Sequence, residues 1–296
     1  MNWEIFNVVA PVLLIAGIGY LFEIRGQGFH SASMSRLVML LGTPALVFSS
    51  LTRTTLPAGD LLKTMLAALV VVLIGACFAV ATLRLAKLPL RPYVASLFLP
   101  NSGNAGLPVV LFAFADEGLA IGAAFFFVIA MCQYVAVPVI MAGRFRVRAV
   151  LEQPLVWAIL GVCAFKLTDT VPPRVIAGST HILGGMTVPV MLVLLGGALA
   201  RLRVGDVWMS LSLALVRLVI GVATGALVII LFGLHGVEAA ALFLLSSMPA
   251  ALVTYVFAER YQQSPERVAG LVVSSTVFTF ALLPGLVMVA MRIAAT

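Results

Sequence analysis

Ten apolar segments, each long enough or nearly long enough to cross a lipid bilayer, follow one another along the chain with short connections. A transmembrane helix needs about 20 predominantly apolar residues. The segments are continuous apolar runs without strand-like alternation, which predicts helices and not a membrane β-barrel. They cover residues 3–22, 34–51, 62–83, 92–114, 118–142, 154–170, 180–200, 207–232, 237–259 and 267–291.

The small number of charged residues supports this interpretation. Only 10% of the 296 residues are charged, whereas a soluble domain carries about 25%. So few charges cannot cover a water-exposed surface, which excludes a soluble enzyme or a nucleic-acid-binding module. The lipid bilayer is the expected surrounding, and the net charge of +7 is attributed to basic residues at one membrane face.

The distribution of lysine and arginine predicts the orientation. With the N-terminus outside, twelve basic residues fall on the cytoplasmic side and five on the outside, as the positive-inside rule requires. We therefore expect both termini outside. The cytoplasmic set is Arg25, Arg36, Arg84, Lys87, Arg91, Arg144, Arg146, Arg148, Arg201, Arg203, Arg260 and Arg267; the outer set is Arg53, Lys63, Lys166, Arg174 and Arg292.

The chain repeats itself at a shift of about 145 residues. Residues 95–113 and 240–258 are identical at nine positions, where apolar composition alone would give about two matches. Pro44 falls on Pro189 at the same shift. The predicted units are residues 1–142, a short basic cytoplasmic linker at 143–153, and residues 154–296. Because each unit has five spans, the second enters the membrane from the opposite side, an arrangement typical of secondary transporters.

Two of the paired segments contain residues that interrupt helices. The fourth segment carries two prolines, two glycines and two asparagines within residues 99–108, which disfavours a continuous helix. The ninth segment carries a matching interruption at residues 246–249, where Ser247 is expected to cap the second half-helix with Pro249 in its first turn. The first interruption comprises Pro100, Asn101, Ser102, Gly103, Asn104, Gly106 and Pro108.

Helix N-termini at the two interruptions predict an anion site. In inverted halves each second half-helix begins near the membrane midplane, where unpaired N–H groups favour a negative charge. The alternative is a pair of proline kinks filled by neighbouring side chains. The side chains expected to supply neutral hydrogen bonds are Asn101, Ser102, Asn104, Ser246, Ser247, Thr254 and Tyr255.

Polar residues elsewhere in the spans leave several roles open. Arg217 lies within the eighth segment, and it could attract a substrate carboxylate, hold carbonyls freed at a helix break, or extend to the headgroups. Gln133 could contact the ligand or make an interhelical hydrogen bond. No carboxylate lies at comparable depth, which counts against coupling through a buried acid but not against sodium held by carbonyls and hydroxyls. The cysteines and histidines have no metal-site spacing, so we expect no metal or cofactor.

The motifs at the two interruptions resemble those of the auxin efflux carrier family. Pro100-Asn101-Ser102-Gly103 with Gly106-Leu107-Pro108 is similar to the signature of its fourth span. Pro249-Ala250 followed by Val256-Phe257-Ala258-Glu259-Arg260-Tyr261 is similar to its ninth. The resemblance covers the whole chain in the short form seen in bacteria, which implies a protein of a bacterial inner membrane. Leu99 and Gly103 differ from the plant pattern, which points away from indole-acetate.

The resemblance implies an all-α membrane fold similar to the bile-acid symporters and sodium/proton antiporters, with crossing broken helices 4 and 9. It implies a scaffold part, spans 1, 2, 6 and 7, that often forms a homodimer contact. It also implies a transport part, spans 3–5 and 8–10. Bacterial members are commonly described as carriers of malonate or other small carboxylates. Carried over by position, Pro100 and Asn101 match the first crossing and Pro249 the second.

We therefore expect a secondary transporter that moves a small organic anion by elevator-type alternating access, and not an enzyme. The first alternative is a sodium- or proton-coupled importer of the same anions. A membrane receptor that binds a metabolite without moving it is the second, and a channel is the third.

Overall fold

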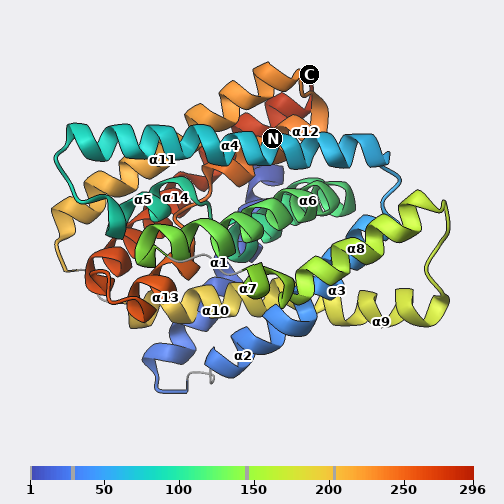
Figure 1. The fold of residues 1–296 in the computed structure, drawn as a ribbon, viewed down its shortest axis with the longest axis horizontal. Coiled ribbons are helices and arrows are strands. Elements are labelled where there is room, and N and C mark those ends of the chain that lie inside the picture. Colours follow the sequence, from blue (N-terminus) through green and yellow to red (C-terminus); the bar gives the residue numbers. More distant parts are fainter. Residues whose placement is uncertain (1, 28–30, 144–146, 203–204) are drawn as a thin grey trace.

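The computed structural model describes residues 2–27, 31–143, 147–202 and 205–296, and every regular element in these ranges is helical (Figure 1). Arg144 and Arg146 of the predicted basic linker, and Arg203, lie outside the described residues. In chain order the elements are α1 (Asn2–Ile24), α2 (Ser31–Leu37), the π-helical turn η1 (Val38–Gly42), α3 (Thr43–Arg53), α4 (Ala58–Leu85), α5 (Leu90–Phe98), the π-helical turn η2 (Ser102–Gly106), α6 (Leu107–Ala142), α7 (Val147–Leu151), α8 (Pro154–Leu167), α9 (Arg174–Gly185), α10 (Thr187–Arg201), α11 (Val207–Phe232), α12 (Gly236–Ser247), α13 (Leu252–Arg260) and α14 (Pro265–Ala294).

Seven helical stretches in the described part of the chain are long and apolar enough to cross a membrane. The chain is therefore an all-helical, multi-pass membrane protein. Two further apolar helices, Pro154–Leu167 and Gly236–Ser247, are shorter. The seven are Trp3–Ile24, Ala32–Arg53, Ala58–Leu85, Ser102–Ala142, Arg174–Arg201, Val207–Phe232 and Pro265–Ala294.

The helix bounds differ from the ten expected segments in an informative way. Segments 92–114 and 237–259 are each divided between two helices, because the chain leaves the helical conformation at 99–101 and at 248–251. Helix α6 consists of two helical stretches that meet at the expected boundary between the fourth and fifth segments. The chain is kinked there at Phe114 and Ala115. Ala115 has a φ of 51°, which L-residues rarely adopt.

The helices pack in two groups. Helix α1 lies along α10, and α3 packs against α8 and α9. Helices α4, α5, α6, α11, α12 and α14 pack with one another. The backbones of α1 and α10 touch at Gly196, where a methyl group would overlap the carbonyl of Ala16.

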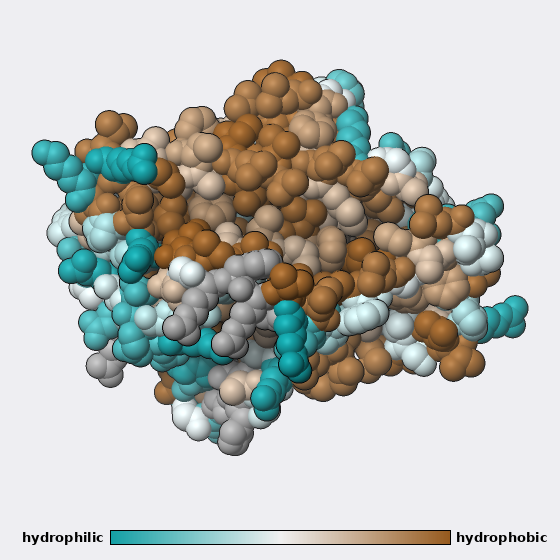
Figure 2. Space-filling model, in the orientation of Figure 1, coloured by the Kyte–Doolittle hydropathy of each residue, from teal (hydrophilic) through white to brown (hydrophobic). Residues whose placement is uncertain are grey.

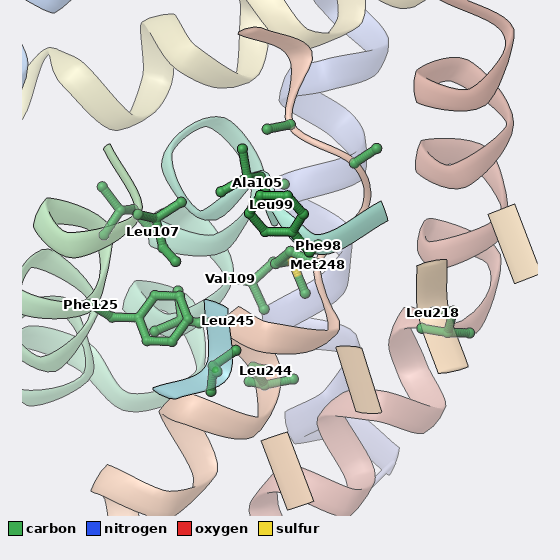
Figure 3. Packing of buried hydrophobic residues seen from close by; sticks show 14 of the residues in the cluster. Phe98, Leu99, Ala105, Leu107, Val109, Phe125, Leu218, Leu244, Leu245 and Met248 are labelled. Carbon is green, nitrogen blue, oxygen red and sulfur yellow. The ribbon is translucent and has the colours of Figure 1, made fainter. Parts of the chain in front are cut away.

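Apolar side chains cover the outside of the molecule as well as its core. Figure 2 shows a broad apolar area across the middle of one face, with hydrophilic residues gathered at its margins. Exposed large residues such as Trp3, Leu14, Trp157 and Ile230 belong to helices that would contact lipid. Inside, the interrupted segments contribute to the main core through Phe98, Leu99, Leu245 and Met248 (Figure 3).

Candidate functional site

The first interruption follows directly from its proline. Helix α5 ends at Phe98 and Leu99 is extended, with φ −93° and ψ 110°. A residue before proline avoids the helical region, and Pro100 itself has no amide hydrogen to donate. Helical structure resumes at Ser102, where the Asn101 side-chain oxygen accepts a hydrogen bond from the Asn104 amide at 3.3 Å. Asn101 is thus the N-terminal cap of the η2–α6 stretch.

The second interruption lies slightly later than the sequence indicated. Helix α12 continues to Ser247, Met248 before Pro249 is extended, and α13 begins only at Leu252. The expected cap by Ser247, with Pro249 in the first turn, is therefore wrong. Both serine hydroxyls, of Ser246 and Ser247, donate backward to the Phe243 carbonyl, at 3.0 and 2.7 Å. Serine side chains in helices often make this backward bond to a preceding carbonyl.

The two interruptions are joined through their backbones. Pro100 and Ala250 form an isolated antiparallel bridge. The Asn101 amide donates to the Pro249 carbonyl at 2.8 Å, and the Ala251 amide donates to the Leu99 carbonyl at 3.1 Å. The Ala250 amide donates to the Ser275 hydroxyl of α14 at 3.1 Å. Residues 99–101 and 248–251 thus form one unit, which we call the crossing.

Arg217 of α11 is buried behind the crossing, with 2% of its surface exposed. Its Nη1 donates to the Leu97 carbonyl at 3.3 Å, and its Nη2 donates to the carbonyls of Ser246 and Met248 at 2.9 and 2.8 Å. The sequence left three roles open for Arg217. The observed contacts match one of them, in which the guanidinium binds carbonyls freed at helix breaks. Its burial is incompatible with extension to the headgroups.

Helix α11 comes unusually close to the end of α12. A methyl group at Gly221 would overlap the Ser246 carbonyl, and one at Gly225 would overlap the Ser246 hydroxyl. Arg217, Gly221 and Gly225 are spaced four residues apart, so they lie on one face of α11. This close approach brings the guanidinium within reach of the carbonyls.

Five buried side-chain polar atoms have no hydrogen-bond partner among the described residues. One is Arg217 Nε, and the other four are Asn101 Nδ2, Ser102 Oγ, Thr43 Oγ1 and Thr187 Oγ1. Thr187 opens α10, which packs against η2, and a methyl group at Gly42, next to Thr43, would lie 2.7 Å from the Thr187 hydroxyl. Buried polar atoms are nearly always paired in proteins, so these atoms need an explanation.

Sequence reasoning missed Thr43 and Thr187. The available signal was that Thr43 directly precedes Pro44 and that Thr187 lies two residues before Pro189, the proline that matches Pro44 across the repeat. Only the fold brings Thr187 beside Gly42, the neighbour of Thr43, from a segment more than 140 residues away.

The remaining expected site residues have different surroundings. A side chain at Gly103 would meet the Phe126 ring, and Pro108 lies buried in the first turn of α6. Thr254 accepts a hydrogen bond from Ser96 at 2.8 Å and donates to the Ala251 carbonyl at 2.7 Å.

The side chains of Tyr255 and Gln133 make no hydrogen bond to the crossing among the described residues. The Tyr255 hydroxyl donates to Glu259 at 3.2 Å, along α13. Gln133 is half-buried in the later part of α6.

A cavity of about 630 Å³ opens between α3, α9, α10 and the kink of α6. Its lining includes Arg53, His181, Asp116 and Glu117. Arg53 Nη1 and His181 Nδ1 lie 2.6 Å apart. Leu46, Val188 and Pro189 also line it, so it reaches within one helical turn of Thr43 and Thr187. A second cavity, of about 550 Å³, lies between the first turns of α4 and α12 and the end of α14. Asn101 and Ser102 line neither of these two cavities.

Comparison with known proteins identifies the family. The model of the membrane transport protein family matches residues 4–162 and 147–287, which together span nearly the whole chain. The chain belongs to this family, the auxin efflux carrier family. The membership makes it a membrane transporter.

Two archaeal relatives of the family are similar along nearly their full lengths. The chain is 26% identical to an uncharacterized transporter of Methanocaldococcus jannaschii, over 92% of this chain and 94% of the relative. It is also 26% identical to an uncharacterized transporter of Methanothermobacter thermautotrophicus, over 94% of this chain and 96% of the relative.

Proposed function

We propose that this protein is a secondary transporter that carries a small organic anion, a mono- or dicarboxylate such as malonate, across the membrane by elevator-type alternating access. The anion binds beside the crossing, between η2 and the first turns of α3 and α10. The second half-helices, η2–α6 and α13, present their N-termini toward it.

Four of the unpaired polar atoms carry this proposal. Asn101 Nδ2 can only donate, and the three hydroxyls of Thr43, Ser102 and Thr187 can each donate. A carboxylate accepts several hydrogen bonds at once, so it complements a set of donors. All four groups are neutral, which gives modest affinity and allows release on the other side.

The packing supports a division into a fixed scaffold part and a moving transport part. The proposed scaffold part contains α1–α3 and α8–α10, which pack mainly with one another. The proposed transport part contains α4–α6 and α11–α14 and includes the crossing. The unpaired threonines belong to the first part and Asn101 and Ser102 to the second, so the ligand would lie between them. In this proposal ten spans form a 5+5 inverted repeat, and the scaffold part forms a homodimer contact.

The cavities support an assignment of the membrane sides. Both are lined by residues of the connections expected outside, including Arg53, Asp60, Glu117, His181 and His235. In the proposal both termini lie outside, in the plasma membrane of the cell. The larger cavity is then the entry path from the outside toward the site.

Flux in proteoliposomes tests the proposal. Purified protein should show saturable uptake of labelled carboxylates that is accelerated when unlabelled carboxylate is loaded inside. Ligand binding without flux would favour the receptor alternative, and non-saturable flux without counterflow would favour a channel. A requirement for a sodium or pH gradient would identify a coupled importer.

A further inference from the structure

We propose that the guanidinium of Arg217 is a built-in cation that fills the carbonyl-lined position at the crossing where a coupling ion would otherwise bind. The carrier then moves its anion without a sodium requirement at this position. The claim about transport without sodium rests on the proposed function. The claim that the carbonyls form a cation position can be tested without measuring flux.

The hydrogen-bond accounting at the crossing explains why carbonyls are free there. In a helix the carbonyl of residue 97 would accept from the amide of residue 101, and that of 246 from the amide of 250. The Asn101 amide instead donates to Pro249, and the Ala250 amide donates to Ser275. The carbonyls of Leu97 and Ser246 have therefore lost their helical donors. Buried carbonyls need replacement donors or a cation.

Arg217 supplies these replacements from a single charged group. Its two terminal nitrogens reach the carbonyls of Leu97, Ser246 and Met248 at 2.8–3.3 Å. These oxygens belong to the C-terminal ends of α5 and α12, the negative ends of the half-helix dipoles. Unwound carbonyls and half-helix C-termini are the groups that coordinate sodium in carriers with broken helices. A guanidinium can satisfy the same carbonyl oxygens through its directional N–H donors.

The position is closed to a second cation while the guanidinium is in place. The guanidinium hydrogen-bonds to carbonyls of both interruptions, and Gly221 and Gly225 bring α11 against Ser246 without intervening side chains. Among the described residues no carboxylate contacts the guanidinium. Its positive charge therefore remains available to balance the negative charge of an anion bound on the N-terminal side of the crossing.

Removing the guanidinium should convert the position into a site for a soluble cation. We would purify wild type, Arg217→Ala and the matched cavity control Leu218→Ala, which removes a buried side chain from the next position of the same helix. Melting temperatures would be measured in choline chloride, then with sodium or guanidinium at constant ionic strength. The expected result is a rise of about 5 °C for Arg217→Ala with either cation, and no comparable change for wild type or Leu218→Ala.

If neither cation stabilises Arg217→Ala more than Leu218→Ala, the carbonyl position is not a cation site and the inference fails. Arg217→Lys keeps the positive charge and serves if the alanine variant does not fold. Its melting temperature should be equal in sodium and choline, and a sodium-dependent value would overturn the inference.

Flux separates this inference from the proposed function. Wild-type carboxylate counterflow is expected to be equal in sodium and in choline. Sodium-dependent counterflow would overturn the inference while leaving the carrier function intact. Absence of saturable counterflow under both conditions would overturn the carrier function, and the melting experiment would still decide whether Arg217 fills a cation position.

Discussion

The amide of Asn101 donates a hydrogen bond to the carbonyl of Pro249 at 2.8 Å, across an interval of 148 residues. Together with the bond from Ala251 to Leu99, it ties the two helix interruptions into one backbone unit. Pro100 lies between the bonded residues Leu99 and Asn101 and has no amide hydrogen to add a third bond. Among the described residues, these two bonds are therefore the direct backbone connections across the crossing.

Removing one of these connections should weaken the unit. Ala251 has φ −64°, which proline can adopt, so Ala251→Pro deletes the amide that donates to Leu99 with little change of backbone conformation. We expect a loss of stability of about 1–3 kcal/mol, measured by chemical or thermal unfolding in detergent. Ala251→Ser retains the amide and is the control. Equal stability of the proline and serine variants would show that the bond contributes nothing.

The close approach of α11 to α12 can be tested with two glycines in membrane-spanning helices. A methyl group at Gly221 overlaps the Ser246 carbonyl, whereas a methyl group at Gly285 meets nothing within 4 Å. Gly221→Ala should destabilise the protein by about 1–3 kcal/mol. Gly285→Ala should be neutral or stabilise it by up to about 1 kcal/mol. If both substitutions change the melting temperature alike, the contact between α11 and Ser246 is not tight.

The first interruption has a local cause that can be recognised in the sequence. Proline and asparagine act on their own backbone, and helical structure ends at Phe98 and begins again at Ser102. The second interruption was harder to place. From the sequence it was expected at residues 246–249, but α12 continues to Ser247 and the chain is extended at 248–251. In this last turn Ser246 and Ser247 both donate back to the Phe243 carbonyl and cap no following helix.

Contacts between distant segments lay beyond sequence reasoning. The sequence placed Arg217 deep in a span, but its partners are 120, 29 and 31 residues away. Choosing among its three possible roles required the fold. The unpaired hydroxyls of Thr43 and Thr187 were not foreseen, because a threonine beside a proline is also typical of an ordinary helix kink.

These two hydroxyls give a prediction that separates binding from folding. Thr43→Val and Thr187→Val replace a buried, unpaired hydroxyl by a methyl group of similar size. Removing an unsatisfied polar group should leave stability unchanged or slightly higher. If the hydroxyls donate to the anion, carboxylate affinity should fall by about tenfold per substitution, as for a lost hydrogen bond to a charged group.

Isothermal titration with a panel of mono- and dicarboxylates measures this affinity. Thr52→Val is the matched control, because its hydroxyl donates to the Phe48 carbonyl of its own helix. Valine variants at 43 and 187 that bind as tightly as the Thr52 variant would place the anion elsewhere.

The most direct test of the central claim is carboxylate counterflow in proteoliposomes with wild type and Asn101→Ala. The Asn101 side chain contributes one cap bond to the fold, while its Nδ2 is buried without a hydrogen-bond partner among the described residues. Its removal should therefore cost only about 1 kcal/mol of stability but abolish most of the flux. The account predicts saturable counterflow by wild type and at least a tenfold loss, by the estimate for a charge-assisted hydrogen bond, in an Asn101→Ala protein that remains folded. Equal counterflow by the two proteins, or none by wild type with any carboxylate, would contradict it.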